Sequence, residues 1–207
     1  MIVIVDYGRG NLRSVQKSLE KMRIACRISD KPDVIDSAEG IIFPGVGAFK
    51  DAMETLDDRG LRKPLKKYIA SGKPFLGICL GLQLLFEYGT EYGKTKGLEI
   101  FKGKVVRFQS EKLRIPHMGW NRVHFDDSPL FAGITQDSYF YFVHSYYAEC
   151  EKDEDITAVT EYGCRFVSAV KKENVYAVQF HPEKSGENGL KIIKNFGEIV
   201  DEYYTGN

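Results

Sequence analysis

The first half of the chain alternates short apolar segments with segments whose apolar residues recur at helical spacing. Residues 2–5, 40–43 and 74–78 contain no polar side chain, which is typical of strands buried on both faces of a parallel sheet. The segment 12–22 instead repeats its apolar residues every three or four positions, behind Asn11 as a predicted N-cap. This alternation predicts a mostly parallel sheet with helices on both faces.

The rest of the chain extends this pattern and then changes it. A further strand is predicted at 24–28, and helices are predicted at 52–56, 61–70 and 80–88. Beyond Leu98, β-branched and aromatic stretches predict strands near 105–106, 123–125, 139–143, 156–160, 166–170 and 175–180, before a closing amphipathic helix around 190–200. No linker or repeat divides the chain. We therefore expect a three-layer α/β/α fold with a mixed sheet, in which residues 1–207 form one domain.

Composition narrows the function classes. Lys plus Arg and Asp plus Glu number 29 each, so charge does not favour binding to nucleic acid or to an anionic membrane. The opening apolar stretch is too short for a signal peptide or a membrane span, and a cytoplasmic location is expected. The four cysteines show no C-x-x-C spacing, which gives no support for a metal site or a redox dithiol. Reduced thiols are expected, and one of them can be a nucleophile.

Cys79 is the candidate nucleophile. The segment 77–81 (Gly-Ile-Cys-Leu-Gly) lies between a predicted strand and a predicted helix, and it resembles the G-x-S-x-G elbow with cysteine in place of serine. Small residues on both sides allow the sharp turn, and the N-terminus of the following helix favours a thiolate. A buried structural cysteine between coincidental glycines is the alternative that this short pattern leaves open.

His181 is the preferred base for this nucleophile. It follows the apolar stretch 175–180 and precedes Pro182, which biases it toward an extended conformation. Glu183, two positions on, can then lie beside the imidazole and orient it. A strand-ending turn without catalytic meaning is the alternative for this segment.

The other histidines have weaker contexts. His144 ends the aromatic stretch 139–143 and is the rival base, but no acidic residue stands two positions after it. We expect it to form part of the pocket wall or the structure. His117 and His124 have no catalytic context and are expected at the surface or in the core.

Five motifs in order extend over almost the whole chain. They are 6–11 (Asp-Tyr-Gly-Arg-Gly-Asn), 44–47 (Pro-Gly-Val-Gly), 77–83 (Gly-Ile-Cys-Leu-Gly-Leu-Gln), 116–121 (Pro-His-Met-Gly-Trp-Asn) and 181–185 (His-Pro-Glu-Lys-Ser). The third and fifth resemble the triad signatures of class I glutamine amidotransferases. Together, the five are similar to the glutaminase subunits of imidazole glycerol phosphate synthase, an enzyme of histidine biosynthesis. Leu82 stands where this family often has methionine, which is a conservative exchange.

The resemblance implies glutamine hydrolysis by a Cys-His-Glu triad. Cys79 would attack the side-chain amide, His181 would move protons and Glu183 would orient it. Backbone N–H groups of Leu80 and of the Val46–Gly47 segment would form the oxyanion hole. Because glycines flank Val46, this hole can be incomplete until a partner binds. By analogy with the family, substrate glutamine would contact Gln83, Ser145 and Tyr146. A surface polar role for Gln83 and aromatic packing for Tyr146 are the alternatives.

The resemblance also implies a partner protein. The family's partner is a (β/α)8-barrel cyclase, which forms a heterodimer with the glutaminase and uses its ammonia. Positions matching the family's interface are Asn11, Trp120, Asn121 and Lys184. Trp120, the single tryptophan, suits an interface anchor, and a core role is its alternative. No cofactor is expected, since there is no P-loop and the 8–11 segment is too short for a dinucleotide fingerprint.

Three other functions are weighed against this one. A paralogous glutaminase would supply ammonia for sugar amidation in surface-polysaccharide synthesis, and the motifs do not exclude it. A stand-alone cysteine hydrolase would turn over its substrate at full rate without a partner. A non-catalytic interaction module is disfavoured because all three triad residue types occur in suitable contexts.

Overall fold

The computed structural model describes residues 1–109 and 113–206. Twelve strands form one mixed sheet in the order β2-β1-β3-β4-β14-β13-β11-β7-β5-β6, with β12 paired to β13 and β9 paired to β12. Strands β10 and β8 form a separate antiparallel ribbon. The strands are β1 (Ile2–Val5), β2 (Cys26–Ser29), β3 (Gly40–Gly45), β4 (Phe75–Cys79), β5 (Phe86–Gly89), β6 (Thr95–Lys96), β7 (Phe101–Arg107), β8 (His117–Arg122), β9 (His124–Phe125), β10 (Tyr139–His144), β11 (Tyr146–Cys150), β12 (Ile156–Glu161), β13 (Arg165–Lys172) and β14 (Val175–Val178). The helices are α1 (Leu12–Lys21), α2 (Pro32–Asp36), α3 (Phe49–Asp58), α4 (Arg62–Ala70), α5 (Leu80–Gln83) and α6 (Gly186–Thr205).

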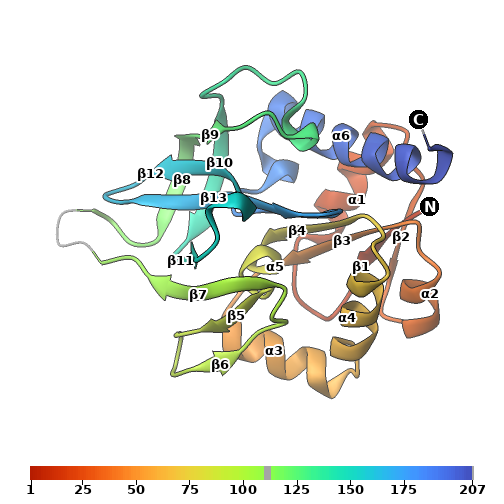
Figure 1. Ribbon diagram of the computed structural model, residues 1–207, viewed down its shortest axis with the longest axis horizontal. Coiled ribbons are helices and arrows are strands. Elements are labelled where there is room, and N and C mark those ends of the chain that lie inside the picture. The colour runs from red at the N-terminus through yellow and green to blue at the C-terminus, as the bar shows by residue number, and fades with distance from the viewer. Residues whose placement is uncertain (110–112, 207) are drawn as a thin grey trace.

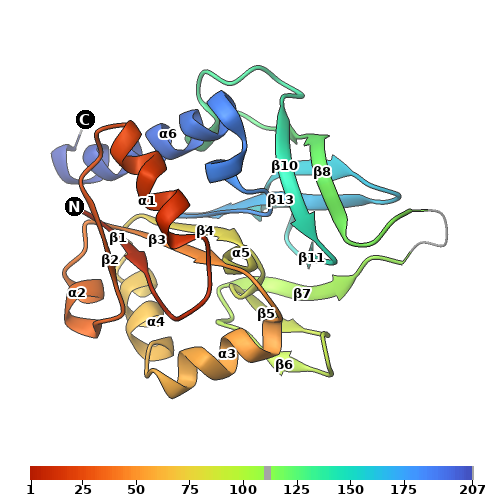
Figure 2. The ribbon, with the colours of Figure 1, turned by 180° about the vertical axis from the view of Figure 1, so that it is seen from behind.

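The parallel half of the sheet is buried between two helical layers. Helices α1 and α6 lie on one face, above the sheet in Figures 1 and 2, and α2, α3 and α4 lie on the other. Successive residues of β1 enter different cores: Ile4 packs with the α1 and α6 side, and Val3 with the α3 and α4 side. This confirms the three-layer α/β/α expectation. Full burial of one such side chain contributes about 1.5–3 kcal/mol, so both layers stabilise each strand.

Strand direction brings four chain segments to one edge of the sheet. Strands β1, β3, β4 and β14 are parallel neighbours, with Gly45 opposite Cys79 and Val178 opposite Ile78. The segments that follow these strands therefore meet at the same carboxyl edge. In open α/β sheets this edge is where ligands bind.

The predicted helix over 80–88 is wrong beyond its first turn. Helix α5 ends at Gln83, and Phe86–Gly89 forms β5, which pairs with β6 and β7. Leu82, Leu84 and Leu85 are all fully buried. The run 84–86 (Leu-Leu-Phe) is too short and too uniformly apolar for its periodicity to distinguish a buried helix from a strand.

The strands β6, β8 and β11 and the short helix α2 were not predicted. Asn11 is the N-cap of α1, as predicted, although its side chain makes no capping hydrogen bond. The amide instead reaches the Glu183 carboxylate, as described below. Within the described part of the chain, no helix has the length and apolar character needed to cross a membrane.

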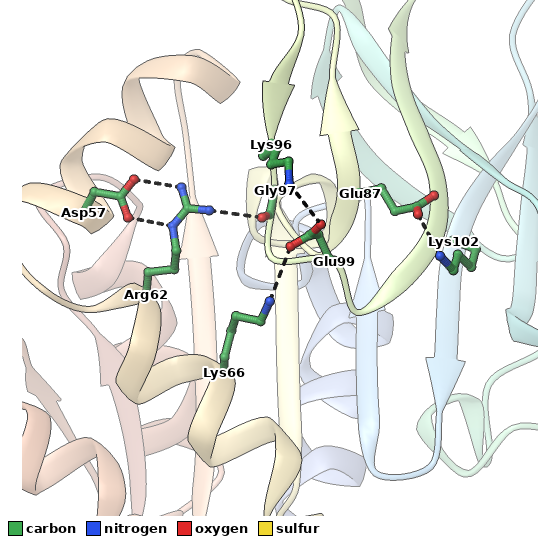
Figure 3. Close-up of polar contacts among 8 residues, drawn as sticks. All are labelled: Asp57, Arg62, Lys66, Glu87, Lys96, Gly97, Glu99 and Lys102. Atoms are coloured by element: carbon green, nitrogen blue, oxygen red, sulfur yellow. Dashed lines mark hydrogen bonds and ion pairs between the residues drawn. The ribbon is translucent and has the colours of Figure 1, made fainter.

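Ion pairs attach α4 to the edge of the sheet (Figure 3). Arg62 binds both carboxylate oxygens of Asp57, at 2.6 and 2.8 Å, and donates to the Gly97 carbonyl at 3.2 Å. Lys66 on the same helix pairs with Glu99 at 3.5 Å. These contacts fix α4 against the chain that links β6 to β7, on the side of the sheet away from α1 and α6.

Candidate active site

Cys79 is held in a strained turn between β4 and α5. Its φ of 57° and ψ of −109° are unusual for a residue with a side chain, and they turn the chain sharply from strand to helix. A Cβ on Gly81 would overlap the Phe43 carbonyl oxygen, and one on Gly77 would lie 3.0 Å from the Gly81 backbone. The close packing around this turn therefore requires both glycines, as the elbow pattern predicted.

His181 and Glu183 lie together after β14. His181 Nδ1 and Glu183 Oε1 are 2.8 Å apart, and these side chains are 2% and 1% exposed. The His181 N–H donates to the Tyr141 carbonyl at 2.9 Å, which fixes the backbone against β10. Since Nδ1 is engaged by the carboxylate, Nε2 is the ring nitrogen left to act on Cys79. The expected juxtaposition of His181 and Glu183 is confirmed.

The charges of this pair support one another. Burial alone would lower the pKa of His181, but Cys79 and Glu183 beside it raise that pKa to about 10. Burial would raise the pKa of Glu183, but hydrogen bonds from His181 and Asn11 hold it below its usual value. At neutral pH the ring is therefore an imidazolium next to a carboxylate. Such a ring can deliver a proton to a leaving group.

A pocket of about 370 Å³ opens over Cys79. Most of the residues named from the sequence line it: Asn11, Val46, Gly47, Cys79, Leu80, Gln83, Ser145, Tyr146, His181 and Lys184. Glu183 lies behind His181, while Trp120 and Asn121 lie on β8, outside this lining. Gly47 has a φ of +99°, a conformation that glycine adopts readily.

Two further polar residues of the site were missed in the sequence. Gln179 is fully buried two residues before His181, and its Nε2 lies 3.7 Å from Cys79 Sγ. Glu91 is the one carboxylate among the described residues that line the pocket, and it also accepts the Phe49 N–H at the start of α3. The available signal for Gln179 was its position as the one polar residue in the otherwise apolar stretch 175–180. Glu91 stands in a segment with no motif, so the sequence offered none.

Gln83 connects the pocket wall to Gln179. Its Nε2 donates to the Tyr146 carbonyl at 2.9 Å and to Gln179 Oε1 at 3.0 Å. Both amide hydrogens are thereby used within the protein, which leaves Oε1 as the group that can accept from a ligand.

His144 is not available as the base. Both ring nitrogens make contacts away from Cys79, with the Tyr146 carbonyl and with His117. Burial lowers the pKa of His144 to about 3, so the ring stays neutral. In the part of the chain that the structure describes, no cluster of three or more His, Cys, Asp or Glu side chains could hold a metal ion.

The residues expected at a partner interface differ in exposure and in their hydrogen bonds within the chain. Trp120 is 54% exposed on β8, and Met118 on the same face of that strand is 60% exposed. Lys184 is exposed at the pocket rim. By contrast, Asn11 and Asn121 use their side-chain amides within the chain.

Comparison with known proteins identifies the family of this chain. The family model for "Glutamine amidotransferase class-I" matches residues 3–200. The chain is 51% identical over 204 residues to "Imidazole glycerol phosphate synthase subunit HisH" of Desulfitobacterium hafniense (strain DSM 10664 / DCB-2), covering 98% of this chain and 96% of the relative. It is 49% identical over 206 residues to the HisH subunit of Syntrophotalea carbinolica, covering 96% of this chain and 100% of the relative.

Solved structures agree on the fold. A crystal structure of a glutamine amidotransferase superposes with a TM-score of 0.76 at 17% identity, covering 97% of this chain and all of that one. PurLQS from Thermotoga maritima gives a TM-score of 0.74 at 19% identity, covering 98% of each chain. At such identities the likeness concerns the fold alone. The family match and the sequence relatives go further: this chain belongs to the class-I glutamine amidotransferase family and, within it, to the HisH subunits of imidazole glycerol phosphate synthase.

Proposed function

We propose that this protein hydrolyses L-glutamine to glutamate and ammonia for histidine biosynthesis, and that residues 1–207 act as one glutaminase domain. The observation that carries the proposal is the convergence of Cys79, His181 and Glu183 at the carboxyl edge of the parallel strands, around one pocket. The HisH relatives, named as subunits of imidazole glycerol phosphate synthase, support the pathway.

In this mechanism the Cys79 proton resides on the His181 imidazolium, and the Cys79 thiolate sulfur attacks the side-chain carbonyl carbon of glutamine. The imidazolium of His181 gives its proton to the departing nitrogen, and ammonia leaves as the thioester forms. The neutral imidazole then takes a proton from water, which attacks the thioester and releases glutamate. Glu183 keeps the ring oriented and stabilises its positive charge during both steps.

Each step also passes through an oxyanion, which backbone N–H groups stabilise. Leu80 N–H, at the start of α5, is one proposed donor, and the other comes from the Val46–Gly47 segment, which follows β3 beside Cys79. The positive φ of Gly47 supports a peptide unit that can rotate at low cost. We propose that partner binding completes the hole. A free subunit with a complete hole and the full glutaminase rate would contradict this.

The pocket chemistry also suits the amino-acid end of glutamine. Gln83 Oε1 can accept from substrate N–H groups because its own amide hydrogens are used within the chain. Glu91 offers a carboxylate to the α-ammonium group. Ser145 and Tyr146 form the wall that follows β10. We assign these four residues to substrate binding.

In this proposal the ammonia passes to an acceptor protein. We propose a (β/α)8-barrel cyclase as this partner in a heterodimer, in line with the HisH relatives, which are named as subunits of a synthase. The exposed side chains of Met118 and Trp120 lie on one face of β8, next to the pocket rim with Lys184. A cytoplasmic location completes the proposal, because all four cysteines are free thiols.

The decisive experiment separates ammonia production from ammonia use. In the complex with the cyclase, Cys79→Ala abolishes glutamine-driven synthesis and leaves synthesis from added ammonium salt intact. Cys150→Ala, which removes a free thiol far from the pocket, serves as the matched control and retains both activities. Glutamine-driven synthesis by the Cys79→Ala complex would refute the proposal.

Two measurements address the alternatives. Deletion of the gene produces histidine auxotrophy if the ammonia goes to this pathway, whereas a sugar-amidating paralogue would leave growth without histidine unchanged. A stand-alone hydrolase would reach its full rate without the cyclase, and a glutaminase assay with and without the partner decides this.

A further inference from the structure

A buried pair of histidines connects strand β8 to the substrate pocket and has no role in the steps above. His117 on β8 and His144 on β10 are directly opposite in the antiparallel ribbon. Their Nδ1 and Nε2 atoms, respectively, are 3.0 Å apart, and the residues are only 3% and 6% exposed. Two buried imidazoles in contact need a fixed arrangement of protons, because each hydrogen bond requires one donor and one acceptor.

The acceptors around the pair determine that arrangement. His144 Nδ1 lies 2.8 Å from the Tyr146 carbonyl oxygen, which can only accept, so Nδ1 carries the proton. Neutral His144 then accepts at Nε2, and His117 donates from Nδ1. This leaves His117 Nε2 as an acceptor, 3.3 Å from Asn121 Nδ2.

Asn121 supports the same direction of donation. Its Oδ1 accepts the Arg122 N–H at 2.8 Å, and its Nδ2 donates to the Glu161 carbonyl at 2.9 Å. The amide orientation is thereby fixed, and Nδ2 is the group that faces His117. The hydrogen bonds therefore run one way, from Asn121 through both imidazoles to Tyr146.

The surroundings keep both rings neutral. Aromatic rings pack around the pair: Phe108, Phe142, Tyr162 and Phe166. Burial lowers the pKa of His117 to about 4 and that of His144 to about 3. The nearby His181, itself charged at neutral pH, also disfavours a positive His144.

The end of this chain of hydrogen bonds lies in the pocket. The Tyr146 carbonyl that accepts from His144 also accepts from Gln83 Nε2, and Gln83 in turn binds Gln179 beside Cys79 Sγ. The start lies next to the exposed Trp120, the neighbour of Asn121 on β8. The same hydrogen-bonded series thus touches the exposed strand and the nucleophile.

We propose that His117 and His144 form a positioning pair for the substrate pocket. Through their hydrogen bonds, the position of Asn121 on β8 fixes the position of the Tyr146 carbonyl. That carbonyl in turn holds Gln83 in its glutamine-binding position. The inference rests on the proposed glutaminase function. It assigns to the two histidines a role in substrate binding rather than in proton transfer to substrate.

The first test needs no variant. Long-range ¹H–¹⁵N NMR spectra of the full chain at pH 7 report the tautomer of each histidine. We expect His117 and His144 to be neutral with the proton on Nδ1 in both rings. An Nε2–H tautomer or a cationic ring at either position would overturn the proposal. This readout is independent of activity, so it can fail while the Cys79→Ala result still supports the glutaminase function.

The second test is kinetic. His117→Phe keeps the stacking with Tyr162 and Phe142 but removes the donor to His144, whereas His117→Asn retains an N–H near the Nδ1 position. In the complex with the cyclase, we expect His117→Phe to lower kcat/KM for glutamine about tenfold, mainly through KM, and His117→Asn to recover most of that loss.

Synthesis from ammonium salt is expected to be unchanged in both variants. Equal losses in the two variants, or no loss in His117→Phe, would contradict a positioning role. If His117→Phe does not fold, the NMR tautomers of the unmodified chain still decide the question.

Discussion

Asn11 donates a hydrogen bond of 3.1 Å to Glu183 Oε1, although the two residues are 172 positions apart in the chain. The same oxygen accepts a hydrogen bond from His181 Nδ1 at 2.8 Å. The residue before α1 therefore helps to orient the carboxylate that orients the histidine. Hydrogen bonds to the charged form of a carboxylate favour that form, which agrees with the lowered pKa of Glu183.

Asn11→Ala removes this support. A buried hydrogen bond to a charged group contributes about 1.5–3 kcal/mol, so we expect glutamine-driven kcat to fall at least about tenfold. Synthesis from ammonium salt is unaffected if the partner still binds. Asn174→Ala is the matched control, because Asn174 donates a part-buried hydrogen bond to the Gly72 carbonyl far from the pocket. A control that loses as much glutaminase activity would contradict the assignment.

Glu91→Gln tests the proposed contact with the α-ammonium group. Glutamine can still accept the Phe49 N–H, so the start of α3 is preserved while the charge is lost. We expect KM for glutamine to rise about tenfold or more with kcat nearly unchanged, as removal of uniform binding requires. Glu87→Gln, which removes a carboxylate on β5 paired with Lys102, leaves KM as it was. Steady-state kinetics of the complex give both values.

Gly81→Ala tests the packing of the turn that carries Cys79. The new Cβ would overlap the Phe43 carbonyl oxygen, because the start of α5 packs directly against the backbone of β3. We expect the free energy of unfolding to fall by about 3 kcal/mol. Gly72→Ala, at a φ of +76° with open space around it, should cost about 1 kcal/mol from backbone strain. Urea unfolding at pH 7 measures the free energy of unfolding of both variants. Equal decreases in the two would contradict the packing argument.

The buried imidazoles predict how stability depends on pH. In the unfolded chain His117 and His144 take up protons near the ordinary pKa of about 6.5, but in the folded chain their pKa values are about 4 and 3. Between these limits the unfolded state binds more protons. Acidification from about pH 6.5 to pH 4 therefore lowers the free energy of unfolding, and stability is regained as the pH rises.

Denaturant unfolding between pH 7 and pH 4.5 measures this dependence. His117→Phe removes one of the two groups, so its stability should fall less steeply over the same range. An unchanged slope in the variant would show that His117 does not contribute to the acid sensitivity.

Much of the site was predictable because it follows local rules. Cys79 between glycines, and His181 before Pro182 and Glu183, are short-range patterns whose geometry depends on neighbouring residues. The parallel strands were predictable for the same reason, since a strand buried on both faces must be continuously apolar. The order of motifs along the chain then indicated the family, which the comparisons bear out.

Other features escaped prediction because they depend on distant contacts. The segment Phe86–Gly89 became strand β5 because β6 and β7 lie beside it, and the short apolar run 84–86 at its start fits a buried helix as well as a buried strand. Asn11 is of a residue type common at N-caps and occupies the N-cap of α1, but its side-chain amide donates to Glu183, which only the tertiary fold brings within reach.

The sequence by itself indicated the fold class and the family of this protein. Residue types at fixed short spacings predicted a thiol nucleophile and its base, and continuously apolar segments predicted a mostly parallel sheet. Only the tertiary structure decided which polar groups share a hydrogen bond: Gln179 with Cys79, Glu91 with Phe49, and His117 with His144. The reason is physical. A hydrogen bond acts over about 3 Å, and only the packed sheet brings residues so far apart in the chain within that distance.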